Sequence, residues 1–374
     1  MKRNIAIFAV LLCALLTACG RAQEETAPTA ETFVTLTETA ATELSTEPET
    51  TVETTLPTET EPVTETAAPT ETLPETTEVV PSDLPPQLLH WDARWNCYTV
   101  SIELGDHSDL SEHLSFGDDH DPHPTMTWEG TYDPDEPDFY PVTVTLTDNM
   151  GNTADYEVTV NVPWEKMHMT TPFSTFRETH AGQHCGIDVS KWQGNIDFDK
   201  VKAEGAEFVL MRIGYGDSGC EMDAYFTQNF ERARAAGLAV GVYFYSTAGS
   251  PDAARQQADW IADQLGGASL DFPVAYDWEN FKHFQDWGMS FDELNAIYAA
   301  FSERMAENGY DTMLYAEPKT LGTAWTTADK TIWLADYGNE TAYTGDYLMR
   351  QVWNCGRIDG IDGEVDMNVC ADLP

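Results

Sequence analysis

The C-terminal half of the chain alternates short apolar runs with longer amphipathic stretches. The runs are almost continuously apolar, which is typical of parallel strands buried on both faces. The amphipathic stretches have helical spacing, and each is followed by a glycine, the usual residue after a helix end. Predicted strands cover 185–190, 208–215, 239–245, 272–279, 312–316, 331–336, 348–353 and 365–369, and predicted helices cover 197–204, 223–236 and 251–265.

The last three predicted strands are separated by too few residues for full helices between them. We therefore expect residues 184–374 to form an irregular α/β barrel of the TIM-like type, with about eight strands but only about five helices. Functional residues of such barrels gather at the carboxyl ends of the strands. Four acids fall at these ends, Asp188, Asp277, Glu279 and Asp336, and they predict an acidic site.

Asp277 and Glu279 stand two residues apart at the end of one strand. Side chains alternate along a strand, so these carboxyls face the same way, about 6–7 Å apart. Glycosidic bond cleavage requires one carboxyl that keeps its proton near neutral pH beside one that stays charged. On spacing alone, a solvated Asp-x-Glu is the commoner explanation. The convergence with other acids favours catalysis.

Short motifs follow one another in order through the same region. They are Gly186-Ile187-Asp188-Val189-Ser190, Trp192-Gln193-Gly194, Ile196-Asp197-Phe198, Arg212-Ile213-Gly214-Tyr215-Gly216, Gly241-Val242-Tyr243, Asp277-Trp278-Glu279, Trp333-Leu334-Ala335 and Val365-Asp366-Met367-Asn368. Each motif is weak alone, but their order and spacing resemble those of the glycoside hydrolase family 25 lysozymes. That resemblance covers about half of the chain and implies hydrolysis of the β-1,4 bond between N-acetylmuramic acid and N-acetylglucosamine in peptidoglycan.

The resemblance also implies a role for each acid. Glu279 becomes the general acid, and Asp277 orients the N-acetyl group of the sugar or stabilises the intermediate that it forms. Asp188 and Asp366 complete the acidic floor. If the last strand returns antiparallel, Asp366 lies at the same barrel end as Asp188. Crowding by three aspartates would then raise the pKa of Glu279, as an acid catalyst needs.

Aromatic residues on the predicted strands are candidates for sugar binding, although alternation sends about half of such residues into the core. Tyr243, Tyr315 and Tyr337, near strand ends, are the best placed, with core packing an equal alternative for each, and Trp333 is a further candidate. Arg212 belongs with the predicted binding residues, more as a buried partner of the acids than as a direct ligand.

Three departures from the family pattern leave its four acids, Asp188, Asp277, Glu279 and Asp366, intact. Phe244 stands where many relatives carry a histidine, Arg350-Gln351-Val352-Trp353 replaces a common Trp-Gln-Tyr, and Ala316-Glu317-Pro318 replaces a small polar pair. They bear on fine substrate preference and not on hydrolysis.

The N-terminus reads as a targeting segment and a tether. Residues 1–19 combine a basic start, an apolar stretch and a Leu16–Cys19 lipobox, so we expect Cys19 to be lipidated and to anchor the chain on the outer face of a bacterial membrane. A plain signal peptide is the alternative. Residues 20–82 are roughly two thirds Thr, Glu and Pro, a composition that does not fold and acts as an extended linker into the cell wall.

Residues 83–163 show period-two alternation with a turn at 148–152, which predicts an all-β module resembling immunoglobulin-like sandwiches. Residues 164–183 are a predicted linker. A spacer is the favoured role of the module, with wall or carbohydrate binding as the alternative. Its acidic runs have calcium-ligand chemistry but need no metal as loop charges, and we expect no metal or cofactor.

The net charge of −45 excludes nucleic-acid binding. Cys185 and Cys370 fall at one end of strands predicted to be neighbours, so a disulfide between them is expected, with free thiols as the alternative. We expect a monomer whose partners are peptidoglycan glycan strands and, through Cys19, the membrane. Two other functions stay open: a catalytically silent peptidoglycan-binding protein, and a glycosidase acting on chitin or another N-acetylated glycan.

Overall fold

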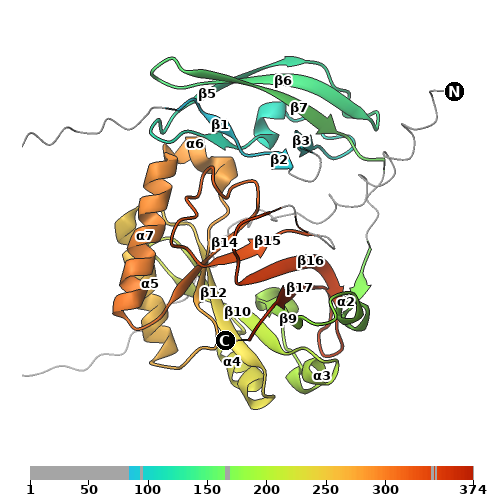
Figure 1. Cartoon of the computed structure of the whole chain (residues 1–374), viewed down its shortest axis with the longest axis vertical. Coiled ribbons are helices and arrows are strands. Elements are labelled where there is room, and N and C mark those ends of the chain that lie inside the picture. Colours follow the sequence, from blue (N-terminus) through green and yellow to red (C-terminus); the bar gives the residue numbers. More distant parts are fainter. Residues whose placement is uncertain (1–83, 93–95, 165–168, 338–340, 342, 374) are drawn as a thin grey trace, which may run out of the picture. The chain divides into compact units, whose positions relative to one another are not determined.

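Eight strands of the C-terminal half close into a barrel. A computed structural model describes residues 84–92, 96–164, 169–337, 341 and 343–373. The barrel strands are β9 (His184–Val189), β10 (Phe208–Gly216), β12 (Ala239–Ser246), β13 (Val274–Asp277), β14 (Thr312–Ala316), β15 (Ile332–Ala335), β16 (Met349–Arg357) and β17 (Val365–Cys370). Strand β9 pairs with both β10 and β17, which closes the ring (Figure 1). A short strand, β11 (Glu221–Met222), extends β10 as a hairpin.

Strand direction makes the barrel irregular, as predicted. All neighbouring barrel strands from β9 through β16 are parallel, whereas β17 is antiparallel to both β16 and β9. No helix separates β15 from β16 or β16 from β17 in the described residues. The antiparallel return places Asp366 opposite Asp188, at the same end of the barrel, as expected.

Alternate residues of each strand face the barrel interior and the helices outside. On β10, Phe208 and Leu210 lie in the interior core, whereas Val209 and Met211 pack in the outer core. The neighbouring β9 needs a glycine at position 186, because a Cβ there would lie 2.4 Å from the Phe208 ring. This alternation decides which acids reach the site.

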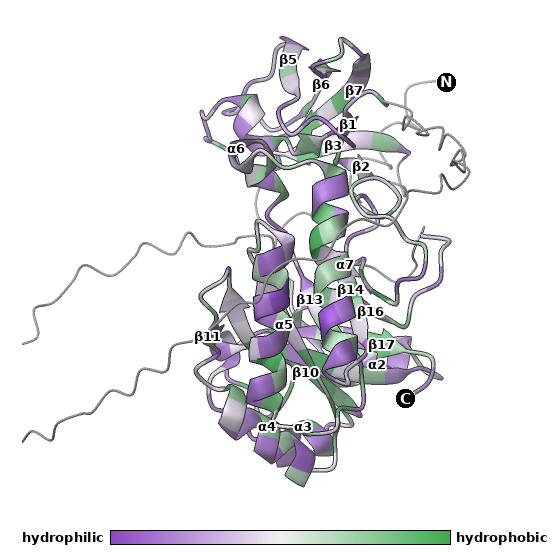
Figure 2. Ribbon diagram, turned by 90° about the vertical axis from the view of Figure 1, so that its left-hand side faces the viewer, coloured by the Kyte–Doolittle hydropathy of each residue, from purple (hydrophilic) through white to green (hydrophobic). Residues whose placement is uncertain are grey.

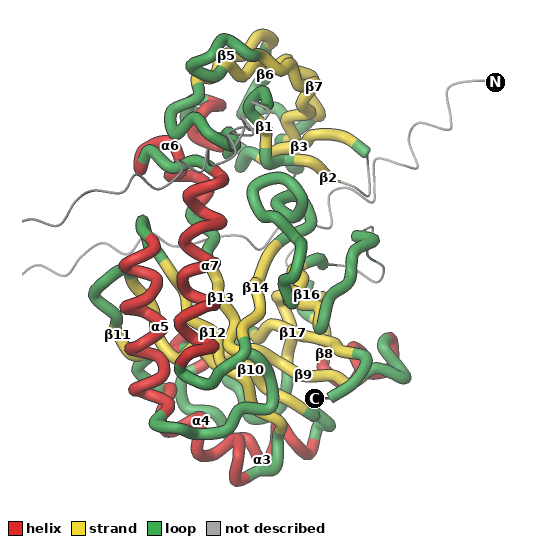
Figure 3. The backbone as a smooth tube through the Cα atoms, turned by 60° about the vertical axis from the view of Figure 1, so that its left-hand side comes forward, coloured by secondary structure: helices red, strands yellow, loops and turns green. Residues whose placement is uncertain are grey.

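The helices cover the outside of the barrel, and their limits follow from local signals. Ser250 caps α5 and Pro251 occupies its first turn, while Ser290 and Glu293 form a capping box on α7. Figure 3 shows α5 and α7 side by side against the strands, and Figure 2 shows hydrophilic and hydrophobic residues alternating along both. The helices of this region are α3 (Phe198–Ala203), α4 (Phe226–Ala235), α5 (Pro251–Leu265), α6 (Phe284–Trp287) and α7 (Phe291–Glu307), with 3-10 turns η2 (Lys191–Gln193) and η3 (Phe281–His283).

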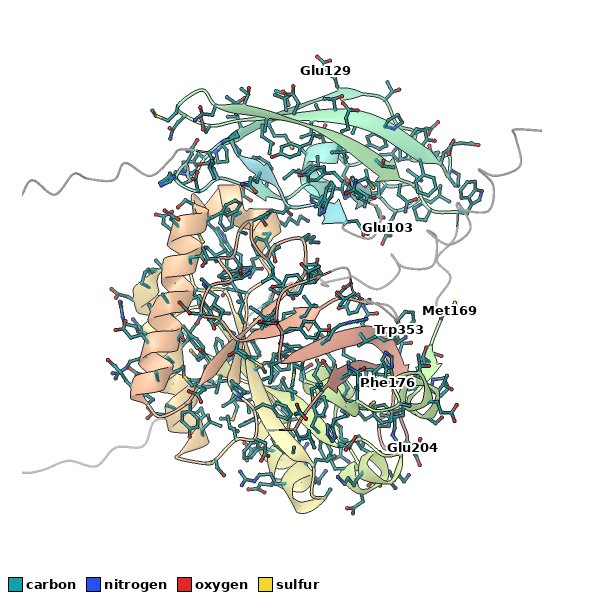
Figure 4. The ribbon with its side chains drawn as sticks, viewed as in Figure 1. Glu103, Glu129, Met169, Phe176, Glu204 and Trp353 are labelled. Carbon is teal, nitrogen blue, oxygen red and sulfur yellow. The ribbon has the colours of Figure 1, made fainter. Side chains whose placement is uncertain are left out.

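The predicted linker over 164–183 is wrong in its described part. Strand β8 (Thr171–Pro172) pairs with β16, and helix α2 (Phe173–Thr179) follows it directly. Phe173 and Phe176 of this helix are buried in the outer core of the barrel (Figure 4 labels Phe176). The burial of these two aromatic rings makes the segment part of the barrel.

Residues 84–164 form an all-β module, as predicted, but not the expected immunoglobulin-like sandwich. Its main sheet has the order β2-β3-β7-β6-β5, and its second sheet contains only β1 and β4, of two residues each. Two such short strands cannot supply the second layer of a seven-stranded sandwich. The strands are β1 (Gln87–Leu88), β2 (Trp91–Asp92), β3 (Cys97–Ser101), β4 (Phe116–Gly117), β5 (Thr125–Gly130), β6 (Phe139–Thr147) and β7 (Thr153–Asn161), with the 3-10 turn η1 (Leu110–His113).

The module is joined to the barrel by more than its connecting chain, and the described residues belong to one compact unit. The carbonyls of Asp118 and Asp119 accept hydrogen bonds from the backbone N–H groups of Phe291 (2.8 Å) and Asp292 (3.2 Å), at the start of α7. These are donors that a helix leaves unpaired. Leu89 of the module, 1% exposed, lies in the outer core of the barrel.

The predicted signal peptide (1–19), its lipidation site Cys19 and the tether over 20–82 lie outside the described residues. Within the described ranges, no helix combines the length and the apolar character needed to cross a membrane.

Candidate active site

Asp188 and Asp366 form the first of two carboxyl pairs at the carboxyl end of the barrel. They lie opposite each other on β9 and β17, and their side chains hydrogen-bond to each other. Oδ2 of Asp188 also accepts hydrogen bonds from Nε2 of Gln351 (2.8 Å) and Nδ2 of Asn368 (2.7 Å). Asp188 is only 5% exposed, so its position is fixed by these contacts.

The two amides are themselves held in one orientation. The hydroxyls of Tyr315 and Tyr337 each donate to Oε1 of Gln351 at 2.8 Å. Nε1 of Trp333 donates to Oδ1 of Asn368, also at 2.8 Å. Because each amide oxygen accepts from a ring donor, each NH₂ group must point at Asp188. Sequence reasoning missed both amides, although Asn368 shares the face of Asp366 two residues earlier.

Proton sharing follows from these contacts. Burial raises the pKa of Asp188, and the hydrogen bonds from Asn368 and Gln351 oppose that rise. Burial and the neighbouring Asp188 carboxylate raise the pKa of Asp366 well above its usual range. Since Asp188 receives two amide hydrogen bonds, the proton of the pair belongs on Asp366.

Asp277 and Glu279 form the second pair, at the end of β13. Burial, and then the charges of Glu279 and Asp188, raise the pKa of Asp277 well above its usual range, and Arg212 opposes this. Within the described residues, Oδ1 of Asp277 is buried without a hydrogen-bond partner. The residue between the two acids, Trp278, is fully buried on the opposite face and donates from Nε1 to the Ala248 carbonyl at 3.1 Å.

Glu279 reaches the solvent-accessible mouth of the site. Desolvation by its surroundings, and then the nearby Glu317 carboxylate, raise the pKa of Glu279 to about 7, while Lys319 acts in the opposite direction. Because the two acids of this pair interact, their protons are shared, and the pair retains at least one proton at neutral pH. Glu279 is the member that can pass a proton to a ligand in the cleft.

The predicted binding aromatics divide into two groups. Tyr243 faces the acids from inside the barrel, and burial together with the Asp188 charge raises its pKa well above the usual range, so its hydroxyl stays a donor. Tyr315 and Tyr337 are partly exposed and orient Gln351. Trp333 is only 1% exposed and packs edge-on against Tyr243 and Tyr315. Its predicted contact with substrate is wrong, because it has no surface left for a sugar.

Arg212 is paired with an acid that sequence reasoning missed. Its Nε donates to Oδ2 of Asp223 at 2.9 Å, and the two side chains are 11% and 1% exposed. The same carboxylate oxygen accepts the backbone N–H of Lys191 at 2.8 Å. Arg212 therefore braces the loop after β9, and its charge acts on Asp277 from a fixed position.

Asp336 does not join the acids, contrary to the expectation from its place at a strand end. Trp333 of the same strand lies in the interior core and Leu334 in the outer core. Alternation therefore turns Asp336 outward with Leu334, where its carboxylate accepts a hydrogen bond from the Thr341 hydroxyl.

The predicted disulfide between Cys185 and Cys370 is not formed, and both residues are free thiols. Cys185 lies opposite Val369, whereas Cys370 lies opposite His184. This offset of one residue sends the two sulfurs to opposite faces of the sheet, with Cys185 in the outer core and Cys370 in the interior.

No group of three or more His, Cys, Asp or Glu side chains in the described part of the chain is arranged to hold a metal ion. The acids at the barrel end are instead hydrogen-bonded to amides and to one another.

Comparison with known proteins finds similarity in the region of the acids. The model of glycosyl hydrolases family 25 matches residues 187–356. The autolytic lysozyme of Clostridium acetobutylicum is 27% identical over 186 residues, which cover 49% of this chain and 54% of that protein. Lysozyme M1 of Streptomyces globisporus is 29% identical over 197 residues, covering 49% and 66%. The chain thus spans between about half and two thirds of these curated relatives.

Solved structures resemble the same half of the chain. The bacterial lysozyme from Streptomyces coelicolor has 25% sequence identity and a TM-score of 0.43, covering 50% of this chain and 92% of its own. A family 25 glycosyl hydrolase from Bacillus anthracis has 21% identity and a TM-score of 0.44, covering 50% and 88%.

Proposed function

Because residues 187–356 form a glycoside hydrolase family 25 domain, we propose that this chain is a peptidoglycan muramidase. It cleaves the β-1,4 bond between N-acetylmuramic acid and N-acetylglucosamine, with Glu279 as the general acid. The observation that supports this most strongly is a carboxyl whose pKa is raised to about 7, at the mouth of a site with three further carboxyls. Such a group holds a proton at the pH where it must donate it.

The proposed reaction begins with proton transfer from Glu279 to the glycosidic oxygen. The bond from that oxygen to C1 of the muramic acid breaks, and N-acetylglucosamine leaves with the proton. Asp277, whose Oδ1 has no other partner within the described residues, binds the N–H of the muramic N-acetyl group. The acetyl oxygen can then bond to C1, and water opens this intermediate while returning a proton to Glu279.

The remaining acids and tyrosines support the positive charge that develops at C1. Asp188 holds a negative charge against its two amide donors, and Asp366 holds the proton between them. Fixed charges of this kind stabilise a transition state without reorganising during the reaction. Tyr243 would donate its hydroxyl hydrogen to a sugar oxygen, whereas Tyr315 and Tyr337, whose hydroxyls donate to Gln351, would accept hydrogen bonds from sugar hydroxyls.

The decisive test uses the full chain on purified peptidoglycan, beside Glu279→Gln. We expect the wild type to clear the suspension and the variant to leave it turbid, with released fragments ending in reducing N-acetylmuramic acid. Turbidity that persists with both proteins, together with retained sedimentation on the wall, would favour the silent binding protein. Cleavage of chito-oligosaccharides in preference to peptidoglycan would favour the alternative glycan.

We propose a location on the outer face of a bacterial membrane, reached through lipidation of Cys19, with the tether over 20–82 extending the enzyme into the wall. Sequence composition supports this. Replacing Cys19 by Ser should move the protein from the membrane fraction into the medium. Equal membrane retention of the variant would reject lipidation at this residue.

A further inference from the structure

A pocket of about 140 Å³ opens beside Glu279. Its lining includes Glu279 but none of Asp188, Asp277 and Asp366, so it lies on the general-acid side of the site. Aromatic rings form much of its wall, and Leu89 and Ser115 of the β-module contribute to it. The pocket is therefore built jointly by the barrel and the module.

Two lysines also line this pocket, Lys282 and Lys319. The whole chain has 19 basic residues against 64 acidic ones, whereas this lining has two lysines against two glutamates, Glu279 and Glu317, so the pocket lacks the acidic excess of the rest of the chain. Nζ of Lys319 lies 2.6 Å from Oε2 of Glu317, and both side chains remain partly exposed. An ammonium group has three donors, and this ion pair leaves donors of Lys319 available to a ligand.

The charge of Lys319 is maintained inside the pocket. Although burial opposes it, the charges of Glu317 and Glu279 raise the pKa of Lys319. The neighbouring His90 is different, because burial and then the Lys319 charge lower its pKa to about 3. Neutral His90 accepts the backbone N–H of Ser115 at 2.7 Å and fixes that wall of the pocket. His90 therefore shapes the pocket, and the lysines supply its charge.

The location of the pocket determines which part of the glycan substrate can reach it. In the proposed reaction, Glu279 protonates the leaving oxygen, so the leaving half of the glycan lies on the side of Glu279. Beyond the leaving N-acetylglucosamine, the next sugar of a peptidoglycan strand is again a muramic acid. That sugar carries a lactyl carboxyl group, either free or joined to a peptide stem with its own carboxylates. Chitin carries none of these groups.

We propose that the pocket beside Glu279 is a carboxylate-binding subsite, in which Lys319, held by Glu317, and Lys282 bind a lactyl or stem-peptide carboxylate of the leaving half. This inference rests on the proposed muramidase function and extends it to substrate selection. It also gives a physical reason for the departure of residues 316–318 from the family pattern, since Glu317 is the partner that positions Lys319.

The test compares three substrates with the full chain: glycan strands bearing peptide stems, strands freed of stems that retain the lactyl carboxylate, and stem-free strands whose carboxyls are reduced to alcohols. We expect Lys319→Gln to raise KM about tenfold on carboxylate-bearing strands, as loss of a charge-assisted hydrogen bond does. On reduced strands the KM values of variant and wild type should agree. Lys282→Gln should give a smaller rise, and Lys202→Gln, which removes an exposed charge on α3, none.

Removal of Lys319 also changes the pKa of Glu279, so a second variant is needed to separate this change from the loss of carboxylate binding. In Glu317→Gln/Lys319→Gln the two opposing charges on Glu279 are removed together, and the pH profile should return toward that of the wild type while the raised KM persists. A rise confined to stem-bearing strands identifies the stem carboxylate, and a rise on both carboxylate-bearing strands identifies the lactyl group. An equal KM rise on reduced strands would overturn the subsite. Failure of the wild type to cleave any strand would instead reject the muramidase function.

Discussion

The two carboxyl pairs of the site differ in how they are held. Asp188 and Asp366 meet across two antiparallel strands, hydrogen-bond to each other, and are braced by Gln351 and Asn368. Asp277 and Glu279 come from one strand end, and Asp277 keeps a buried oxygen without a partner within the described residues. In the first pair, Asp188 is hydrogen-bonded to two amides of the protein, whereas in the second pair an oxygen of Asp277 is left for a substrate.

This difference separates the work of the two pairs. A carboxylate with fixed donors holds its charge and its position, which suits stabilisation of a cation. A carboxyl at the mouth of the cleft, with a pKa of about 7, suits proton transfer. Four acids that look equivalent in the sequence thus have two kinds of environment, and substitutions should affect the two pairs unequally.

The largest effect on kcat is expected in the pair formed by Asp277 and Glu279, which we call the unbraced pair, in contrast to the braced pair formed by Asp188 and Asp366. Replacing Glu279 by Gln should lower kcat about 10³-fold, because the amide cannot donate a proton to the leaving oxygen. KM should change less than about threefold, since the amide preserves the shape of the side chain. Steady-state kinetics on soluble glycan strands provide the measurement. A kcat loss of less than tenfold would mean that Glu279 is not the general acid.

Much of this architecture could be predicted from local sequence pattern. The apolar runs gave the eight strands, and the antiparallel return that brings Asp366 to Asp188 follows from the short connection before β17. Features that depend on a one-residue shift in strand register could not be predicted from this local pattern. The offset that separates Cys185 from Cys370 is one residue, and the outward turn of Asp336 depends on the parity of β15.

Partners from distant segments were also beyond local reasoning. Asp223 reaches Arg212 only because the β11 hairpin folds back on β10, and Gln351 reaches Asp188 across 163 positions of sequence. Nothing in the local sequence around Leu89 indicates that it fills the core of the barrel. These contacts depend on tertiary packing, whereas the acids themselves are marked by their place at strand ends.

The braced pair should show an internal asymmetry. Replacing Asp188 by Asn should lower kcat about 10²-fold, because the site loses the charge that opposes the developing cation. Replacing Asp366 by Asn should cost about tenfold or less, because the amide retains a hydrogen-bond donor where Asp366 holds a proton. Parallel kinetics of the two variants provide the check. Equal losses would show that the proton is not confined to Asp366.

The pH dependence of kcat/KM tests the unbraced pair through the pKa of Glu279. In the wild type, kcat/KM should fall as the pH rises above about 7, because Glu279 loses the proton that it must donate. The Glu317 carboxylate raises the pKa of Glu279, so Glu317→Gln should move this limb to lower pH. Lys319→Gln should move it to higher pH. Profiles that coincide for all three proteins would exclude Glu279 as the titrating group.

The smallest effect concerns stability and again distinguishes the two pairs. The pKa of Glu279 is raised in the folded protein from an ordinary value of 4.5 to about 7, so ionisation is disfavoured by folding. Its contribution therefore lowers stability progressively as the pH rises from about 4.5 to about 7, and Glu279→Gln removes this loss. Because Glu279 is exposed, solvent screens much of this effect, and we expect the variant to melt about 1–2 °C above the wild type at pH 8, with little difference at pH 4. Calorimetry at both pH values measures this difference in Tm.

Gln351→Leu provides the contrast in the other pair. That substitution removes a donor from Asp188 and leaves its carboxylate buried with one amide, so it should lower the Tm at pH 8. A variant of Glu279 that melts below the wild type at pH 8 would mean that this carboxyl is stabilised by its surroundings, as Asp188 is, and would remove the distinction between the pairs.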